Sequence, residues 1–324
     1  MSSTPHDALF TAVFGKPEHA AGALRSVLPA AVAETLDWST LAPCSGNFVD
    51  DLLRKRYGDV LFSIAWRGGG DALLYLLFEH QSTSDRWMAF RLLRYLVRIW
   101  ERWLDENPEA EALPVVIPVV LYHDTKTWTA PVTFEELFEI PDAVRSALGP
   151  HLVRFSYLID DLSLVPDDHL RGRAMTALAR LVTVCFKHAR THTDIFKLLA
   201  DWADVVRDVL RAPNGTEALA IVVRYIYLVN EYVDRETLQV FLADMVPDAK
   251  DAIMTAGERL IEQGVQQGVQ QGKCELLLHQ LRRRFGDQIT AETELRVVKA
   301  SAEQLLLWSD RILTAATLRE LFAD

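Results

Sequence analysis

Two stretches of apolar residues in the first third of the chain predict a pair of strands. Val60–Trp66 and Ala72–Gln81 are rich in large apolar side chains. Residues 67–71, Arg-Gly-Gly-Gly-Asp, are a strong turn signal between them. We therefore expect an antiparallel hairpin. The leucine-rich composition of the second stretch, taken alone, also allows a buried helix.

The next two patterns add a helix and a third strand. Residues from Ser84 to about Asn107 have helical periodicity, and Ser84 is the expected N-cap. An Asn-Pro pair ends the helix, because the residue before a proline disfavours helical geometry. Val115–Tyr122 is a nearly continuous apolar run, which is typical of a buried strand, and its Pro118 indicates an edge or an irregularity.

The remainder of the chain is mainly helical in pattern. Residues 6–28 predict a short helix pair broken near Gly15-Lys16-Pro17, and Phe155–Ile159 is a further strand candidate. Apolar residues recur at helical spacing in the following segments: Ala174–His188, Asp194–Leu210, Thr216–Val233, Arg235–Met245 and a long helix from Asp248 to Arg284. The predicted fold class is α/β (α+β), a mixed sheet core flanked by helices and followed by an all-helical C-terminal region. The predicted domains are residues 1–165, 166–246 and 247–324.

Composition narrows the class of protein. Lys+Arg is 34 and Asp+Glu is 45, so the formal net charge of −11 argues against an indiscriminate coat for nucleic acid but leaves room for a local basic groove. Three widely spaced cysteines in no CxxC pair favour incidental thiols in a reducing cytoplasm. We see no signal peptide and no apolar run long enough to cross a membrane, so we expect a cytoplasmic protein with no membrane partner.

The ends of the two hairpin strands carry the candidate chemistry. Residues two apart on a strand share a face, so Glu79 and Gln81 are expected on one side of the sheet. Asp59 opens the preceding strand, and a hairpin of this length brings it close to Glu79. Two carboxylates at one edge suit Mg²⁺, which takes oxygen ligands. The alternative is a turn at residues 57–59 that caps a strand, with an exposed strand end at residues 79–81.

Three segments of the sequence carry a recognisable pattern: FVDDLLRKRYGDVLFSIAW, then ALLYLLFEHQSTSDRWMAFRLLRYLVRIWE, then PVVIPVVLYHD. They resemble the Rpn family of recombination-promoting nucleases, also described as YhgA-like transposases, in the PD-(D/E)XK nuclease superfamily. The opening HDALFTAVFG and the late MTAGERLIEQGVQQGVQQGK are similar to the start and tail of that family. The resemblance is densest over residues 5–125.

This resemblance implies a restriction-endonuclease-like sheet in residues 1–165 and a DNA endonuclease that uses Mg²⁺ or another divalent cation such as Mn²⁺. It implies that Asp59 and Glu79 are metal ligands and that the backbone carbonyl of His80 is a third ligand. Gln81 stands where the superfamily most often has lysine. Glutamine can orient a water molecule but cannot neutralise charge, so another cation has to compensate. The alternative function is a non-catalytic DNA-binding or assembly protein that keeps the fold.

Arginines on the predicted helix are the candidates for that cation. Four of them form one stripe at spacings of three and four, with Trp87 and Tyr95 beside it: Arg91, Arg94, Arg98 and Arg102. We expect them, extended by Arg54 and Arg56, to contact DNA phosphates. A solvated basic face is the alternative interpretation.

Four further features remain open. Asp7 is a possible additional acid of the metal site, or an N-cap. His123 follows the third strand and either faces the site or is an ordinary strand end. The ladder of Gly264, Gly268 and Gly272 in the long C-terminal helix allows close approach of a second helix but also weakens the helix, so it indicates either a mobile tail or a tail ordered against a partner chain. A homo-oligomer through this helix is our hypothesis. The basic run 282–284 at the end of this helix either touches DNA or complements the helix dipole.

Overall fold

The structure is a computed structural model, and its description covers residues 4–44, 60–69, 71–79 and 84–322. For residues 71–79, 267, 287 and 291 it covers the backbone alone. The described chain divides into two compact units, residues 3–254 and residues 255–324. Each unit is described by itself.

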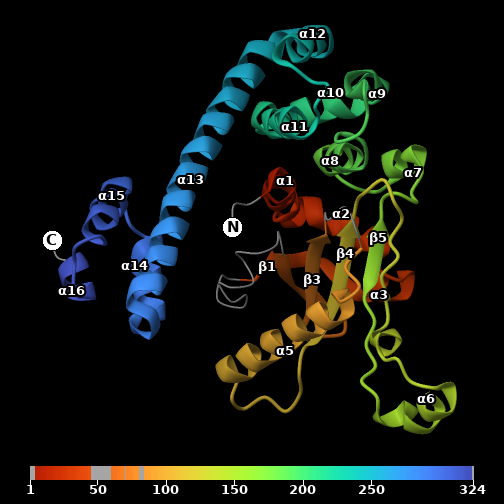
Figure 1. The fold of residues 1–324 in the computed structure, drawn as a ribbon. Helices are drawn as coiled ribbons and strands as arrows, with labels where there is room; N and C mark the ends of the chain where they lie inside the picture. The colour runs from red at the N-terminus through yellow and green to blue at the C-terminus, as the bar shows by residue number, and fades with distance from the viewer. Residues whose placement is uncertain (1–3, 45–59, 70, 80–83, 323–324) are drawn as a thin grey trace. The chain divides into compact units, whose positions relative to one another are not determined.

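The first unit is built around a five-stranded sheet with strand order β1-β2-β3-β4-β5 (Figure 1). The strands are β1 (Leu36–Pro43), β2 (Val60–Trp66), β3 (Asp71–Glu79), β4 (Val115–Tyr122) and β5 (Leu158–Asp161). The first three strands pair antiparallel, and β3, β4 and β5 pair parallel. The predicted hairpin, helix and third strand are therefore confirmed. The helical alternative for the second stretch is wrong.

The hairpin turn and the proline of β4 both follow from local backbone chemistry. Gly69 in the turn has a φ of 95°, which glycine adopts without strain. Pro118 pairs with Tyr75 of β3, whereas β5 pairs only with residues 119–122 of β4. The proline thus lies where β4 has one neighbouring strand, because a residue without an amide hydrogen is tolerated only there. The predicted edge is confirmed for this part of the strand.

Helix α5 (Met88–Glu106) covers one face of the sheet. Its buried side chains pack in a single core with Leu61 of β2, Val120 of β4 and Tyr157. The helix starts later than the sequence predicted. Ser84 is not its N-cap, because the Ser84 hydroxyl accepts hydrogen bonds from the amide and hydroxyl of Thr129. The Asp85 carboxylate, and not Ser84, accepts a hydrogen bond from the Trp87 amide at the start of the helix.

Small elements complete the sheet region. Helices α1 (Pro5–Phe14) and α2 (Pro17–Val27) are the predicted pair, broken at residues 15 and 16, and α3 (Ala30–Thr35) leads into β1. The sequence predicted neither α3 nor β1. The strand candidate Phe155–Ile159 is displaced by about three residues, to β5. Between β4 and β5 lie η1 (Phe134–Leu137), α6 (Asp142–Leu148) and η2 (Gly149–His151).

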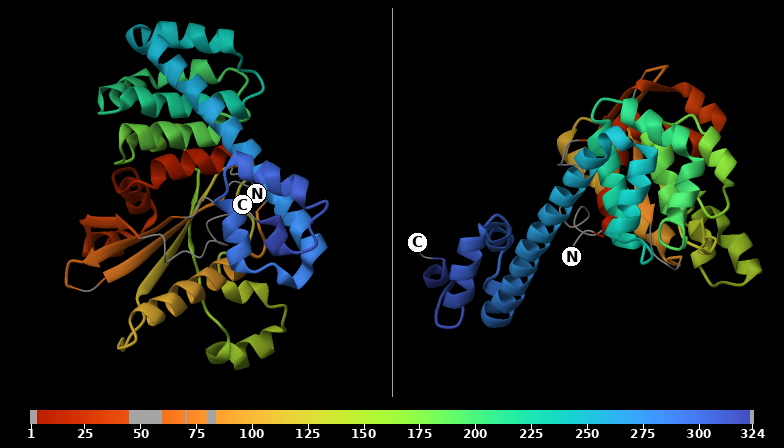
Figure 2. Two further views of the ribbon diagram at one scale, coloured as in Figure 1. Left: turned by 90° about the vertical axis from the view of Figure 1, so that its left-hand side faces the viewer. Right: turned by 90° about the horizontal axis from the view of Figure 1, so that it is seen from above.

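The remainder of the first unit is helical, as predicted. Its helices are α7 (Asp167–Gly172), α8 (Ala177–His188), α9 (Ile195–Asp201), α10 (Ala203–Arg211), α11 (Gly215–Val229), α12 (Arg235–Met245) and η3 (Pro247–Ala249). The one helix predicted for residues 194–210 is divided at Trp202, which caps both α9 and α10. The N-terminal helix α1 packs against α8 and α11, so it belongs to the sheet region and to the helical region at once (Figure 2).

The second unit has its own core. Most of α13 (Lys250–Phe285) belongs to it, followed by η4 (Gly286–Gln288), α14 (Ala291–Val298), α15 (Ala302–Arg311) and α16 (Leu318–Leu321). Leu277 and Leu281 of α13 pack with Leu305 and Trp308 of α15. The domain boundaries predicted at residues 165 and 246 stay predictions. No helix among the residues that the structure describes is long and apolar enough to cross a membrane.

Candidate functional site

Three strands meet at the end of the sheet where the sequence predicts the site. Val60, the residue after Asp59, begins β2 and pairs with Leu76 of β3. Glu79 is the last residue of β3, and its Cα partner in β4 is Tyr122. Because β2 runs against β3 while β4 runs with it, the start of β2 lies at the same end of the sheet as the ends of β3 and β4.

The described part of the chain contains only some of the predicted site residues. The following lie outside it: Arg54, Arg56, Asp59, His80 and Gln81. Their roles, and that of the Glu79 side chain, stay predictions. Among the residues that the structure does describe, no group of three or more His, Cys, Asp or Glu side chains is placed to hold a metal ion.

Two histidines lie together directly after β4. His123 is buried, and its ring centroid is 5.0 Å from that of His6 on α1. The Nδ1 atom of His123 lies 2.9 Å from the Phe186 carbonyl oxygen. A carbonyl only accepts, so Nδ1 carries the hydrogen, and Nε2 is the acceptor nitrogen of the neutral ring. His123 is therefore a buried, oriented side chain at the sheet end and not an exposed strand terminus.

The helical region supplies the partner of the second histidine. His6 Nδ1 is 2.9 Å from the hydroxyl oxygen of Tyr225 on α11. Burial raises the pKa of Tyr225 well above its usual range, so the hydroxyl stays protonated and uncharged. Burial likewise raises the pKa of the neighbouring Cys185 thiol to about 12, which keeps that sulfur inert. Aromatic and neutral polar groups of α8 and α11 thus cover the two histidines beside the end of β4.

Asp7 has a structural role in α1. Thr4, not Asp7, is the N-cap, and the two residues form a capping box. One carboxylate oxygen, Oδ2, accepts from the Thr4 amide at 3.1 Å and from the Thr4 hydroxyl at 2.9 Å. Asp7 follows His6 in sequence and is thus next to the residue that contacts His123. A metal ion bound by Asp7 would therefore have to share this carboxylate with the helix cap.

The arginines of α5 differ in their surroundings. The Arg91 side chain is largely buried and donates to Asp85 at 3.1 Å, and Arg102 donates to Glu106 at 3.1 Å. Arg98 is half-buried and Arg94 is exposed. Tyr95, which the sequence placed beside the stripe, is buried in the core under α5, because it lies on the side of the helix nearer the sheet. The four arginines therefore do not form one uniform basic face.

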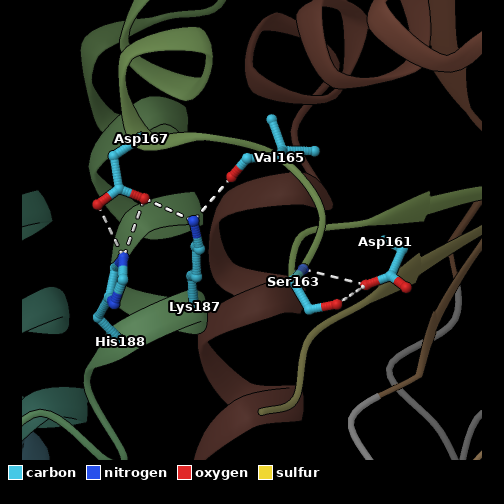
Figure 3. Close-up of polar contacts among 6 residues, drawn as sticks. All are labelled: Asp161, Ser163, Val165, Asp167, Lys187 and His188. Atoms are coloured by element: carbon cyan, nitrogen blue, oxygen red, sulfur yellow. Dashed lines mark hydrogen bonds and ion pairs between the residues drawn. The ribbon is translucent and has the colours of Figure 1, made fainter. Parts of the chain in front are cut away.

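Acidic side chains gather at the end of β5 and on α7, and they are held by protein partners. Asp161 accepts from the amide and hydroxyl of Ser163, and on α7 Asp167 accepts from Lys187 at 2.6 Å and from His188 at 2.9 Å (Figure 3). Asp160 accepts from two nitrogens of Arg173, at 2.6 and 2.8 Å. Of these carboxylates, Asp160 joins β5 to Arg173 at the end of α7, whereas Asp167 joins α7 to α8.

Sequence reasoning did not identify Tyr225 or the Phe186 carbonyl as members of the sheet end. His6 and Tyr225 are 219 residues apart, so no local pattern connects them. The arrangement provides an oriented imidazole at His123 and a protonated phenol beside His6. Such groups can position a ligand or relay a proton, but they add no anionic charge.

Comparison with known proteins identifies the family of this chain. A family model described as "Putative transposase, YhgA-like" matches residues 4–217, which include the whole sheet and both histidines. The chain belongs to this family. The match begins at the capping box of α1 and ends at the start of α11, so it spans the sheet and most of the helices that close its end. No solved structure gave a significant match.

Curated relatives extend over most of the chain. Recombination-promoting nuclease RpnD of Escherichia coli O157:H7 is 32% identical over 265 residues, covering 80% of this chain and 95% of that protein. Recombination-promoting nuclease RpnA of Escherichia coli strain K12 is 31% identical, covering 81% of this chain and 85% of that protein. A third relative from strain K12, named inactive recombination-promoting nuclease-like protein RpnE, is 28% identical and covers 90% of this chain and 94% of its own length. The resemblance to the Rpn family is confirmed.

Proposed function

We propose that this protein is a metal-dependent DNA endonuclease of the PD-(D/E)XK class, which hydrolyses phosphodiester bonds in recombination or mobile-element transactions. The supporting observation is the strand arrangement. The residue after Asp59 and the backbone of Glu79 lie at one end of a mixed sheet, in a chain whose relatives are named recombination-promoting nucleases. Membership of the family is the second support.

The proposed ligands suit a hard divalent cation. Asp59 and Glu79 offer carboxylate oxygens and His80 offers a backbone carbonyl, the donors that Mg²⁺ and Mn²⁺ accept. No other set of donors competes with them among the described residues. When bound, the metal ion polarises the scissile phosphate and lowers the pKa of a bound water.

The chain's own residues divide the remaining tasks. In this proposal Gln81 orients the attacking water through its amide. Arg91, Arg94, Arg98 and Arg102 on α5 hold the DNA backbone by charge-assisted hydrogen bonds, with Arg54 and Arg56 extending the contact. Because Arg91 and Arg102 already pair with Asp85 and Glu106, DNA phosphates have to replace these carboxylates. Asp7 is the possible additional acid.

A plasmid-nicking assay tests the proposal. Supercoiled DNA is incubated with the protein and Mg²⁺ or Mn²⁺, with a chelator as the metal-free reaction. Asp59→Ala and Glu79→Ala are expected to lower the nicking rate by roughly 100-fold or more, because each removes a ligand of the catalytic ion. Asp208→Ala is the matched control, since Asp208 is an exposed acid on α10. Equal cleavage by all three variants, with unchanged circular dichroism, contradicts the assignment.

A second candidate function is a non-catalytic DNA-binding or assembly protein with the same fold. Two observations favour it: the relative RpnE, whose name calls it inactive, covers most of this chain, and glutamine stands at position 81. This candidate predicts DNA binding that weakens between about 50 and 200 mM salt without metal-dependent cleavage. An electrophoretic mobility assay run beside the nicking assay separates the two functions.

A further inference from the structure

The outward face of α5 carries an apolar stripe that the sheet does not use. Phe90, Val97 and Leu104 recur at intervals of seven residues, and their exposed fractions are 47%, 41% and 44%. Seven residues make nearly two helical turns, so the three side chains lie above one another on one side of the helix. Trp87, at the N-cap, is exposed at the start of the same stripe. Exposed apolar side chains in a row mark a contact surface.

The charges between these apolar residues are arranged by sign. The exposed arginines Arg86 and Arg94 flank the stripe in its first half, and the exposed acids Glu101 and Asp105 flank it in its second half. None of the four is in an ion pair with any residue that the structure describes. An isolated helix is stabilised by acids near its N-terminus and bases near its C-terminus. The order here is the reverse, so the stability of α5 alone does not explain it.

This order of charge fits one partner in particular. We propose that α5 pairs antiparallel with α5 of a second copy of this chain, across a two-fold axis at Val97. The axis sets Phe90 of one copy against the position of Leu104 in the other, and Arg94 within one residue of the position opposite Glu101. The interface is then isologous, since each copy contributes the same surface. Parallel pairing instead sets Arg94 on Arg94 and Glu101 on Glu101, which is repulsive.

The dimer is expected to be weak. A helix of 19 residues is roughly 28 Å long, and two such helices bury less surface than a standard protein interface. An association of micromolar strength follows. In this dimer Arg94 makes the protein contact in place of the DNA contact proposed for it, while Arg91, Arg98 and Arg102 remain for nucleic acid. The inference therefore does not depend on the proposed nuclease activity.

Charge reversal at two positions tests the antiparallel register. Sedimentation analysis of the full chain at about 100 μM is expected to show a dimer that Arg94→Glu or Glu101→Arg weakens by about tenfold each. The double variant Arg94→Glu/Glu101→Arg restores it, because the two charges exchange places across the axis. A wild-type chain that stays monomeric, or a double variant as weak as either single one, overturns the proposal.

A cysteine placed on the axis gives an independent test. Val97→Cys is expected to form a covalent dimer under mild oxidation, because the two sulfurs face each other across the axis. Leu276→Cys on α13 is the control, since Leu276 is also exposed and lies on the C-terminal helix. Cross-linking of the control and not of Val97→Cys assigns the interface to the C-terminal helix and overturns the proposal. If Arg94→Glu and Glu101→Arg leave the molecular mass in solution unchanged but alter DNA binding, the stripe is a DNA contact, and this result also overturns the proposed dimer.

Discussion

The burial of a carboxylate in an ion pair determines how much the pair contributes to stability. Asp160 is almost fully buried and accepts two hydrogen bonds from Arg173, whose side chain is itself mostly buried. Asp208 and Arg211 form an ion pair of similar distance on the exposed face of α10. A buried pair is costly to break because the remaining charge loses both its water and its partner.

Arg173→Met is therefore expected to lower the free energy of unfolding by roughly 3–5 kcal/mol, since it leaves the Asp160 carboxylate buried without its partner. Arg211→Met, the exposed counterpart, is expected to change the free energy by less than about 0.5 kcal/mol. Urea denaturation followed by circular dichroism measures both. Equal effects of the two substitutions contradict the argument.

The ionisation of Asp167 leads to a prediction about the stability of the protein at acidic pH. Burial raises the pKa of this carboxyl, but hydrogen bonds from Lys187 and His188 outweigh burial, so its pKa in the folded protein lies below the usual value of 3.8. A depressed pKa stabilises the fold fully above that value, and the contribution is lost as the pH falls through the folded pKa.

Asp167→Asn is expected to destabilise the protein at neutral pH, and this difference from wild type is expected to shrink below about pH 4. Unfolding midpoints in urea at pH 7, 5, 4 and 3 measure the difference. Asp208→Asn is the control at an exposed ion pair. A constant difference at every pH shows that the hydrogen bonds to Asp167 do not depend on its ionisation.

At the scale of the element, α2 requires a glycine for close packing, whereas α13 has room for a larger side chain at a glycine position. A Cβ at Gly22 would lie 2.6 Å from the Ala174 carbonyl oxygen and 2.8 Å from the Met175 Cα, so α2 needs glycine to approach this backbone. A Cβ at Gly268 in α13 has nothing within 4 Å. Substitution at these two glycines therefore distinguishes the effect of packing on stability from the effect of helix propensity.

Gly268→Ala is expected to stabilise the second unit by up to about 1 kcal/mol through helix propensity. Gly22→Ala is expected to destabilise the first unit by more than that gain, because backbone atoms block the methyl group. Thermal unfolding measured by circular dichroism gives the sign of each change. A stabilising effect of Gly22→Ala shows that α2 can move away from residues 174–175.

The same scale shows which elements the sequence could predict. Val60–Trp66 and Val115–Tyr122 match β2 and β4 to the residue, because each is an apolar run bounded by turn signals or charged residues. Strand β1 escaped prediction because LDWSTLAP has polar residues at its centre, where the register shifts between Asp37 and Ala42. Trp202 divides a continuous helical pattern by tertiary burial, which periodicity does not register.

The candidate site was predictable from the sequence only in part. Spacing alone left Asp59 and Glu79 open as a metal site or a strand end, and the motifs around them identified the family, which is confirmed. Their roles stay predictions. The buried setting of His123 depends on Phe186 and, through His6, on Tyr225, which come from helices much later in the chain. Residues brought together by tertiary packing leave no periodic signal in the sequence.

At the scale of the whole molecule, the two units have separate cores. Leu305 on α15 is fully buried in the core of residues 255–324, whereas its neighbour Leu306 is 58% exposed. In the basic run of α13, Arg282 pairs with Glu294, and Arg284 donates to the carbonyls of Ile312 and Ala315. Two of these three arginines thus serve the fold of the second unit.

Leu305→Ala is expected to destabilise the second unit by roughly 2–5 kcal/mol, while Leu306→Ala changes it little. Hydrogen exchange followed by mass spectrometry on the full chain reports each unit separately. Faster exchange in α14 and α15 with unchanged α8 and α11 is the expected result. Faster exchange throughout the chain shows that the units unfold together.

The packing of α1 on α8 and α11 sets an order of events during synthesis. The first helix leaves the ribosome early, but Tyr225, which bonds His6, is made more than two hundred residues later. At about 5–20 residues per second, α1 waits roughly 10 to 45 s for its final partners. The histidine pair beside the end of β4 is therefore fully covered only after α11 has emerged, so an N-terminal fragment that stops before α11 leaves His6 without its Tyr225 partner.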